Sequence, residues 1–320
     1  MLLSRVAENL YWMSRYVERA ENLARLLHVG FYLELDAAEL AREGGNGPVD
    51  SLLTIFACRD AYAAGGGTGE RDEILRFLTF DRQNPQSVLR LVASARENAR
   101  GTQETVSAEA WSHVNRLYLF LSGPRAQRRF RASPSRFFDA VKRACILFGG
   151  LIDSTLPRTE TFHFLQVGRY LERVDQMSRV LLSKSPALSP AGPGNGALSM
   201  GLVHWTSLLR SCSAYEAYLR SHHDRIDPVS VVRYLVLDPD FPRSVRFGIA
   251  RCRESLHEVS GGDADEFRSE AERRLGRLDS DLRYLDVDEI FERGLPTFLT
   301  GVQDACGRIG EEIHHAYFAS

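Results

Sequence analysis

The sequence predicts an all-α protein made of two homologous multi-helix repeats that pack with approximate internal twofold symmetry. Apolar residues recur at helical spacing along most of the 320 residues, and no sustained alternation of apolar and polar residues indicates a strand. Residues 15–27 and residues 169–181 share the pattern R-Y-[VL]-E-R-[AV]-[ED]-[NQ]-[LM]-[AS]-R-[LV]-L, an offset of 169 − 15 = 154. The chain is also longer than one hydrophobic core usually serves.

The duplication extends beyond this helical segment. Asp81–Val88 and Asp238–Val245 share an Asp, a Pro, a Ser and a Val at the same spacing, and Arg96-Glu97 returns as Arg253-Glu254. Both recur at an offset of 157 residues. The offset thus increases slowly from 154 along the chain, as it would if loops in the second half had gained a few residues. We therefore predict about six helices in each repeat. One repeat covers residues 1–154 and the other residues 155–320, unless the two form one continuous bundle.

In the first half, the spacing predicts helices separated by turns rich in glycine, proline and asparagine. The predicted helices cover residues 2–42, 51–63, 72–78, a segment that includes 95–100, 103–121, and a last helix from 134 to about 150. Asn84 and Pro85 have the residue types of an N-cap and a first helical position. Because Phe241 replaces Asn84 in the second half, we expect a weaker cap there. Residues 185–196, rich in Pro, Gly and Ser, predict a surface loop.

A stripe of two arginines, a glutamate and an amide runs along one face of each repeated helix. Its members are Arg15, Glu18, Asn22 and Arg25 in the first copy and Arg169, Glu172, Gln176 and Arg179 in the second. We predict a polar network built from these stripes, the neighbouring arginines and the later Arg-Glu pairs. The candidate residues are Arg15, Glu18, Arg19, Arg25, Arg169, Glu172, Arg173, Arg179, Arg96, Glu97, Arg253 and Glu254.

Three interpretations of this network remain open. A solvated helix face would carry the same charges in weak i,i+3 and i,i+4 pairs. A buried network would instead cross-pair the two copies where the repeats face each other and so fix their packing. Alternatively, two arginines beside a glutamate on each helix hold a carboxylate-bearing ligand, such as an amino acid or a peptide.

Composition narrows the class of protein. With a net charge of −2 and a pI near 6.5, the chain does not have the basic character of proteins that bind nucleic acids or anionic membranes, so we expect neither partner. Five cysteines stand at scattered positions without a C-x-x-C motif, which indicates reduced, buried thiols. No apolar stretch resembles a signal peptide or a membrane span, and we predict a cytoplasmic location.

No motif identifies a catalytic residue. The sequence lacks a P-loop, a G-x-S-x-G elbow and an H-E-x-x-H helix. Glu-x-x-His pairs occur as Glu254/His257, Glu311/His314 and Glu312/His315, and a di-metal site in a four-helix bundle uses two such pairs with further glutamates. Because such pairs are common by chance in charged helices, we predict neither a metal nor another cofactor.

With both repeats laid out, the sequence resembles the bacterial alpha-E domain family, helical proteins named for a recurring Glu-Arg motif. The resemblance covers essentially the full length. The matching segments are residues 3–12 leading into 15–21, residues 81–88, residues 95–100 and residues 168–173.

This resemblance implies a role without naming a reaction. Members of the family tend to be encoded beside, or fused to, a circularly permuted ATP-grasp amide ligase, often with a transglutaminase-like peptidase. The resemblance therefore predicts a non-catalytic accessory or docking component of a peptide-synthesis or peptide-tagging system, with the ligase as partner and a transglutaminase-like protein as a second one. The competing hypothesis is a stand-alone enzyme, or a small-ligand binder that uses an Arg-Glu cleft or a di-metal site.

Overall fold

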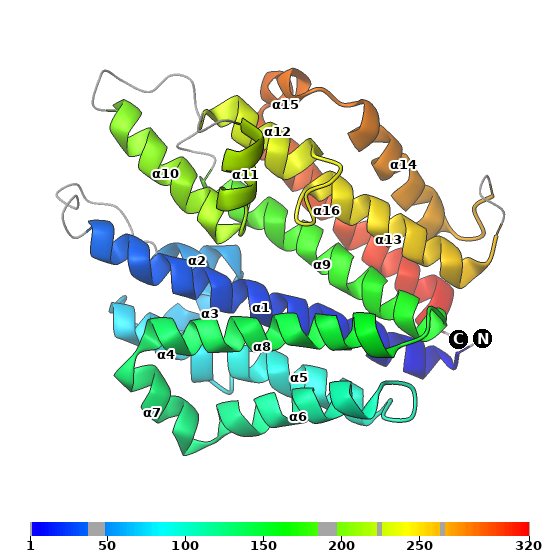
Figure 1. Cartoon of the computed structure of the whole chain (residues 1–320), viewed down its shortest axis with the longest axis horizontal. Coiled ribbons are helices and arrows are strands. Elements are labelled where there is room, and N and C mark those ends of the chain that lie inside the picture. The colour runs from blue at the N-terminus through cyan, green and yellow to red at the C-terminus, as the bar shows by residue number, and fades with distance from the viewer. Residues whose placement is uncertain (1, 38–48, 185–196, 223–225, 263–265, 320) are drawn as a thin grey trace. The chain divides into compact units, whose positions relative to one another are not determined.

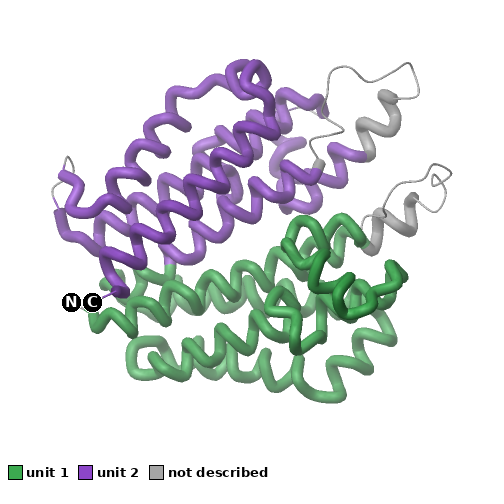
Figure 2. The backbone as a smooth tube through the Cα atoms, turned by 180° about the vertical axis from the view of Figure 1, so that it is seen from behind, with its two compact units in different colours: residues 1–165 green, residues 166–320 purple. Residues whose placement is uncertain are grey.

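The computed structural model describes residues 2–37, 49–184, 197–222, 226–262 and 266–319, and every regular element in these ranges is a helix. The all-α prediction is confirmed. The chain divides into two compact units, residues 1–165 and residues 166–320 (Figure 2). The division lies inside helix α9 (Glu160–Lys184). The loop predicted over residues 185–196 lies outside the described residues.

The first unit contains eight described helices before α9 begins. They are α1 (Ser4–Ala37), α2 (Asp50–Ile55), α3 (Arg59–Ala64), α4 (Arg71–Phe80), α5 (Val88–Arg100), α6 (Ala108–Ser122), α7 (Pro124–Ala132) and α8 (Pro134–Thr155). Helix α1 packs along α8 and α5, and α6 packs against α5 and α8 (Figure 1). Fully buried leucines on α1, among them Leu10, Leu23 and Leu27, form the centre of this core.

Helix α9 is the long first helix of the second group. The others in the described residues are α10 (Ala197–Ser211), α11 (Tyr215–His222), α12 (Pro228–Leu237), α13 (Val245–Ser260), α14 (Glu270–Tyr284), α15 (Val287–Arg293) and α16 (Leu295–Ile313), followed by a π-helical turn, η2 (His314–Phe318). Gly248 on α13 lies so close to α9 that a Cβ there would meet a methyl group of Val174 at 2.5 Å. A glycine at this position therefore permits the close approach of the two helices.

Several predicted boundaries were wrong. The helix predicted from residue 103 begins at Ala108, because the Ser107 hydroxyl accepts a hydrogen bond from Ala110 N–H and caps it there. Helix α8 does not end at Gly149-Gly150 but continues to Thr155, with both glycines inside it. The described helices number eight from α1 to α8 and eight from α9 to α16, in place of about six in each repeat.

The repeated turn before α5 and α13 makes the same hydrogen bonds in both units. In the first, the Asp81 carboxylate accepts from the N–H groups of Gln83 and Asn84 at 2.7 and 3.0 Å. The Ser87 hydroxyl donates to the Asp81 carbonyl and accepts from Arg90 N–H. Ser87, and not Asn84, is therefore the N-cap, which corrects our prediction.

In the second unit, Asp238 and Ser244 take the places of Asp81 and Ser87. The Asp238 carboxylate accepts from Asp240 and Phe241 N–H at 2.9 and 2.7 Å, and the Ser244 hydroxyl caps Phe247 N–H at 3.0 Å. Phe241 does not weaken this cap, contrary to our expectation, because its side chain takes no part in it.

Two residues other than glycine have a positive φ in the described part of the chain, and they lie 156 residues apart. Ala57 has φ 50° and Ser213 has φ 51°. Each lies just after the C-terminal end of a helix, α2 or α10, and in each case the next residue donates its N–H to a carbonyl five residues earlier. Chain reversals between α2 and α3 and between α10 and α11 thus share one strained local conformation.

All five cysteines are free and buried, as predicted. Burial raises the pKa of the Cys58 thiol to about 11. Burial also raises the pKa of Cys145, and the carboxylates of Glu21 and Glu18 raise it further. Among the helices of the described ranges, none is both long and apolar enough to cross a membrane.

We expect Ser87→Ala and Ser244→Ala each to lower the free energy of unfolding by about 1–2 kcal/mol, because each removes an N-cap and a bond to the turn. Chemical denaturation measures the change. Ser280→Ala, at an exposed position on α14, is the matched control and should change stability by less than about 0.5 kcal/mol. Equal effects at all three positions would contradict the capping role.

We also expect the native protein to show no rapidly reacting thiol toward a thiol-specific reagent at pH 8, because each thiol is buried and a raised pKa keeps the thiols of Cys58 and Cys145 protonated. In denaturant all five should react. A fast-reacting thiol under native conditions would contradict the burial seen here.

Candidate functional site

The repeated segments lie on the two longest helices in the described residues, α1 and α9, and both are buried on every side over their central turns. Residues 20–27 of α1 and residues 171–178 of α9 are buried without interruption. Arg25 lies within the first stretch and Glu18 just before it, and Glu172 and Arg173 lie within the second. All four are at most 7% exposed. The interpretation as a solvated helix face is therefore wrong for these four residues.

Each central helix contains an ion pair at the same place in the repeat. Arg25 pairs with Glu21 in the first unit, with side chains 5% and 3% exposed. Arg179 Nε lies 2.8 Å from Asp175 in the second unit, with side chains 34% and 11% exposed. The spacing is i,i+4, with the acid toward the N-terminus, which is the favourable order for such pairs.

The arginine that follows the motif glutamate binds the repeated turn. Arg19 donates to the side-chain oxygen of Gln86 at 3.3 Å, and Arg173 donates to the Pro242 carbonyl at 3.1 Å. Both acceptors lie in the turn that leads into α5 or α13. Arg19 and Arg173 therefore connect the central helix of their own unit to the next long helix.

The first arginine of each motif lies against aromatic rings and is only half-buried. Arg15 donates to the Tyr11 hydroxyl at 2.8 Å, and its guanidinium carbon lies 5.0 Å from the centre of the Trp12 ring. The guanidinium of Arg169 lies 5.8 Å from the Tyr170 ring. Glu172, which is fully buried, accepts a hydrogen bond from the Gln176 amide at 3.1 Å.

The later Arg-Glu pairs occupy helices α5 and α13 and reach the next helix of their unit. Arg96 donates to Asn115 on α6 at 2.7 Å, and Arg253 lies 2.9 Å from the buried carboxylate of Asp279 on α14. The glutamates of these pairs, Glu97 and Glu254, are about half exposed and form ion pairs with arginines of their own helices. Arg96 thus connects α5 to α6 and Arg253 connects α13 to α14, while the two glutamates lie at the surface.

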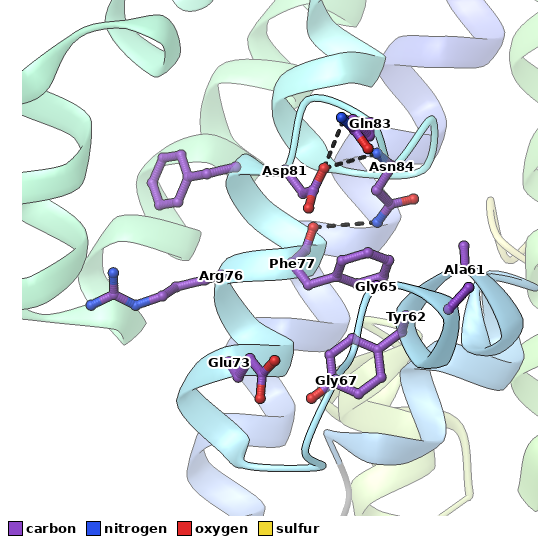
Figure 3. A pocket seen from close by; sticks show the side chains of 12 residues that line it. Ala61, Tyr62, Gly65, Gly67, Glu73, Arg76, Phe77, Asp81, Gln83 and Asn84 are labelled. Carbon is purple, nitrogen blue, oxygen red and sulfur yellow. Dashed lines mark hydrogen bonds between the residues drawn. The ribbon is translucent and has the colours of Figure 1, made fainter.

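A cavity of about 610 Å³ opens in the first unit between α3, α4 and the repeated turn. It lies over the face of α4 that carries Glu73, Arg76, Phe77 and Phe80. In Figure 3 the Phe77 ring lies between Tyr62 on α3 and Asn84 on the turn. The volume lies within the range of about 300–1,000 Å³ that is usual for small-molecule sites.

Hydrogen bonds hold the polar groups of this cavity in place. Glu73 accepts from Thr68 N–H and hydroxyl at 3.0 and 2.5 Å, and these bonds keep the pKa of Glu73 below its ordinary value. The Tyr62 hydroxyl accepts from Gly69 N–H at 3.0 Å. Asn84 donates to the Phe77 carbonyl at 3.3 Å.

The Glu-x-x-His pairs are not assembled into a metal site. In the described part of the chain, no three His, Cys, Asp or Glu side chains lie close enough together to hold a metal ion. His314 and His315 are exposed in the turn η2. Glu254 pairs with Arg251 at 2.8 Å.

Sequence reasoning missed three features of the site. Glu21 and Asp175 recur within the repeated segment and stand four residues before an arginine, so the i,i+4 rule would have found them. Asp279 is buried between Arg253 and Arg283, at 2.9 and 3.0 Å. Because its helix contains many charged residues, nothing in the sequence indicates that this one is buried. The cavity beside α4 depends on tertiary packing.

Fold and site together define an all-helical protein in which two long helices, α1 and α9, each carry a Glu-Arg motif with a buried glutamate. The chain belongs to the Alpha-E family, described as a predicted alpha-helical domain with a conserved ER motif, whose sequence pattern matches residues 2–318. This finding confirms the family resemblance. Glu18-Arg19 and Glu172-Arg173 are the Glu-Arg pairs of the two central helices.

The protein is also similar to longer mycobacterial proteins. An uncharacterized protein of Mycobacterium bovis and one of Mycobacterium tuberculosis strain CDC 1551 are each 23% identical over 303 residues, and a third, from strain H37Rv, is 22% identical. Each match covers 90% of this chain but 33% of the relative, so the chain spans about a third of their length. No solved structure matches.

We expect Arg25→Met to lower the free energy of unfolding by about 3–5 kcal/mol, because it leaves the carboxylate of Glu21 buried without its ion pair. Arg179→Met removes the equivalent arginine at a more exposed site and should lower it by about 1 kcal/mol or less. Denaturant titration of both variants compares the two pairs directly. Equal losses would show that burial does not decide the contribution of this ion pair.

Proposed function

We propose that this protein is a non-catalytic helical accessory component that docks to an ATP-grasp amide ligase in a system that makes or tags peptides. A transglutaminase-like protein would be a second partner. The observation that supports a non-catalytic role is that arginines of the repeated segment make structural contacts inside their own unit. Arg25 and Arg179 each pair with an acid of their own helix, and Arg19 and Arg173 bind the turn of their own unit.

The relatives give independent support for a module that works with another domain. In the mycobacterial proteins a region similar to this chain accounts for about a third of a longer polypeptide. A helical module that forms one part of a longer polypeptide is typical of a component that cooperates with other domains. The proposal assigns the nucleotide chemistry to that partner.

Two further expectations belong to this proposal. Free, buried cysteines support a cytoplasmic location, where thiols stay reduced. The matching turns, caps and left-handed residues of the two units support descent from one duplicated module, and we propose that the two repeats pack about an approximate twofold axis. Neither expectation is needed for docking itself.

The competing hypothesis is a binder of small carboxylates through the motif arginines. It requires guanidinium groups that a ligand can reach. Arg15 and Arg169 are only half-buried and could serve, whereas Arg25 and Arg173 are at most 7% exposed. The two hypotheses therefore differ in what substitution of Arg15 and Arg169 should do.

We expect the full chain, co-expressed with an ATP-grasp amide ligase of the same organism, to co-elute with that ligase as a complex with a dissociation constant in the micromolar range or below. Size-exclusion chromatography with light scattering measures the complex, and ADP release measures ligase turnover. The chain alone should release no ADP. Absence of a complex at tens of micromolar, or ATP hydrolysis by the chain alone, would contradict the proposal.

An Arg15→Ala, Arg169→Ala double variant separates docking from ligand binding. Loss of the complex in a variant that keeps its helical circular dichroism would place the ligase on these arginines. Glu97→Gln, a change at an exposed position on α5, is the matched control and should leave the complex intact. Binding of a free amino acid to the wild-type chain but not to the double variant would favour the small-ligand hypothesis instead.

A further inference from the structure

Each unit contains an edge-to-face pair of aromatic rings between its third and fourth helices. In the first unit the rings of Tyr62 and Phe77 lie 5.1 Å apart at 61°, and in the second the rings of Tyr218 and Tyr234 lie 5.4 Å apart at 76°. The offsets, 218 − 62 = 156 and 234 − 77 = 157, are those of the sequence repeat. This ring pair is therefore a common feature of the two units, and the groups around it can be compared.

The second unit adds another ring where the first has none. Phe241 stacks on Tyr234 with ring centres 4.7 Å apart and planes at 27°. At the equivalent position in the first unit stands Asn84, whose amide donates to the Phe77 carbonyl. An asparagine is smaller than a phenylalanine, and the cavity of about 610 Å³ opens beside it.

The walls of this cavity are fixed. A Cβ on Gly67 would meet the Tyr62 ring at 2.4 Å, so the backbone lies directly against that ring. The Tyr62 hydroxyl is held by Gly69 N–H and the Asn84 side chain is buried. A ligand would therefore meet a preformed site and lose little affinity to ordering it.

Charge around the cavity favours a cation. Glu73 and Asp81 are the two carboxylates in its lining, and Arg76 is the one arginine. In Figure 3 the Arg76 side chain points away from the rings of Phe77 and Tyr62. The carboxylates accept hydrogen bonds from the protein but form no ion pair in the described structure, so each keeps its negative charge available to a ligand.

We propose that this cavity binds an aromatic side chain of a peptide segment that carries a basic residue beside it. The aromatic ring packs near Phe77 in the space that opens beside Asn84, much as Phe241 packs on Tyr234 in the second unit. The basic residue lies toward Glu73 or Asp81. The second unit has no need of such a ligand at the equivalent place, because its own Phe241 supplies the ring. The proposed site lies wholly in the first unit, and the proposal is independent of the ligase assignment.

The test uses blocked dipeptides and the full chain. Acetyl-Phe-Lys-amide is titrated and followed by saturation-transfer NMR and calorimetry. Acetyl-Ala-Lys-amide and acetyl-Phe-Glu-amide are the comparison peptides. We expect the Phe-Lys peptide to bind, and both comparison peptides to bind at least about tenfold more weakly. No binding of the Phe-Lys peptide, or equal binding of the Ala-Lys peptide, would overturn the proposal.

Two substitutions locate the site. Asn84→Phe copies the second unit and should reduce binding at least about tenfold, because its ring occupies the place of the ligand. Ala61→Trp places a bulky ring on the exposed α3 edge of the cavity and should do the same. Ala63→Trp, on the same helix outside the cavity lining, is the matched control and should bind as the wild type does.

Circular dichroism and the thermal midpoint show which variants fold. If Asn84→Phe unfolds, the comparison of Ala61→Trp with Ala63→Trp decides the question, since both change an exposed alanine. Binding unchanged in a folded Asn84→Phe or Ala61→Trp variant would overturn the proposal, as would an equal loss in Ala63→Trp.

Discussion

A helix that is buried on every side and still carries charges must satisfy those charges inside the protein. Transfer of an ionised group from water into the interior costs several kcal/mol unless a partner of opposite charge or a set of hydrogen bonds compensates. Helix α1 meets this requirement in part with the pair Glu21–Arg25, and α9 with Asp175–Arg179 and with the bonds from Gln176 to Glu172 and from Arg173 to Pro242. Because each pair lies within one helix, a duplicated helix carries its own compensation with it. This explains in physical terms why charge and spacing recur together.

The same constraint connects the central helix to the rest of each unit. Arg19 and Arg173 extend from the central helix to the turn in front of α5 or α13, and the aspartate and serine of that turn set where the helix begins. One continuous set of hydrogen bonds therefore connects the central helix, the turn and the N-cap of the next helix. A change in the motif arginine would disturb the start of a helix some 70 residues away in the chain, as the separations of 67 and 69 residues show.

Much of the fold followed from the sequence because its signals are local. Helical periodicity, the absence of strand patterns and the buried thiols depend on neighbours along the chain. The N-cap was misplaced because Asn84-Pro85 has the composition of a helix start, while the Asp81 side chain organises these residues as a turn and leaves capping to Ser87. The stripe through Arg15 and Glu18 omitted Glu21, which lies off that stripe and is the partner of Arg25. The cavity beside α4 could not be predicted from the sequence, because it depends on how three segments pack.

The repeats differ in the rings around the edge-to-face aromatic pair: Phe241 stands where the first unit has Asn84, and His222 stacks on Tyr218 with ring centres 4.2 Å apart. Stacking a buried ring on Tyr234 stabilises the second unit through apolar burial and aromatic contact. The same substitution is open to the first unit, whose turn makes equivalent backbone hydrogen bonds, yet that unit has an asparagine and an open cavity. A cavity lined by aromatic rings forgoes favourable contacts that a larger side chain would provide. The space beside the turn is filled by Phe241 in the second unit and is open in the first. This difference is consistent with a structural role for the second unit and a binding role for the first.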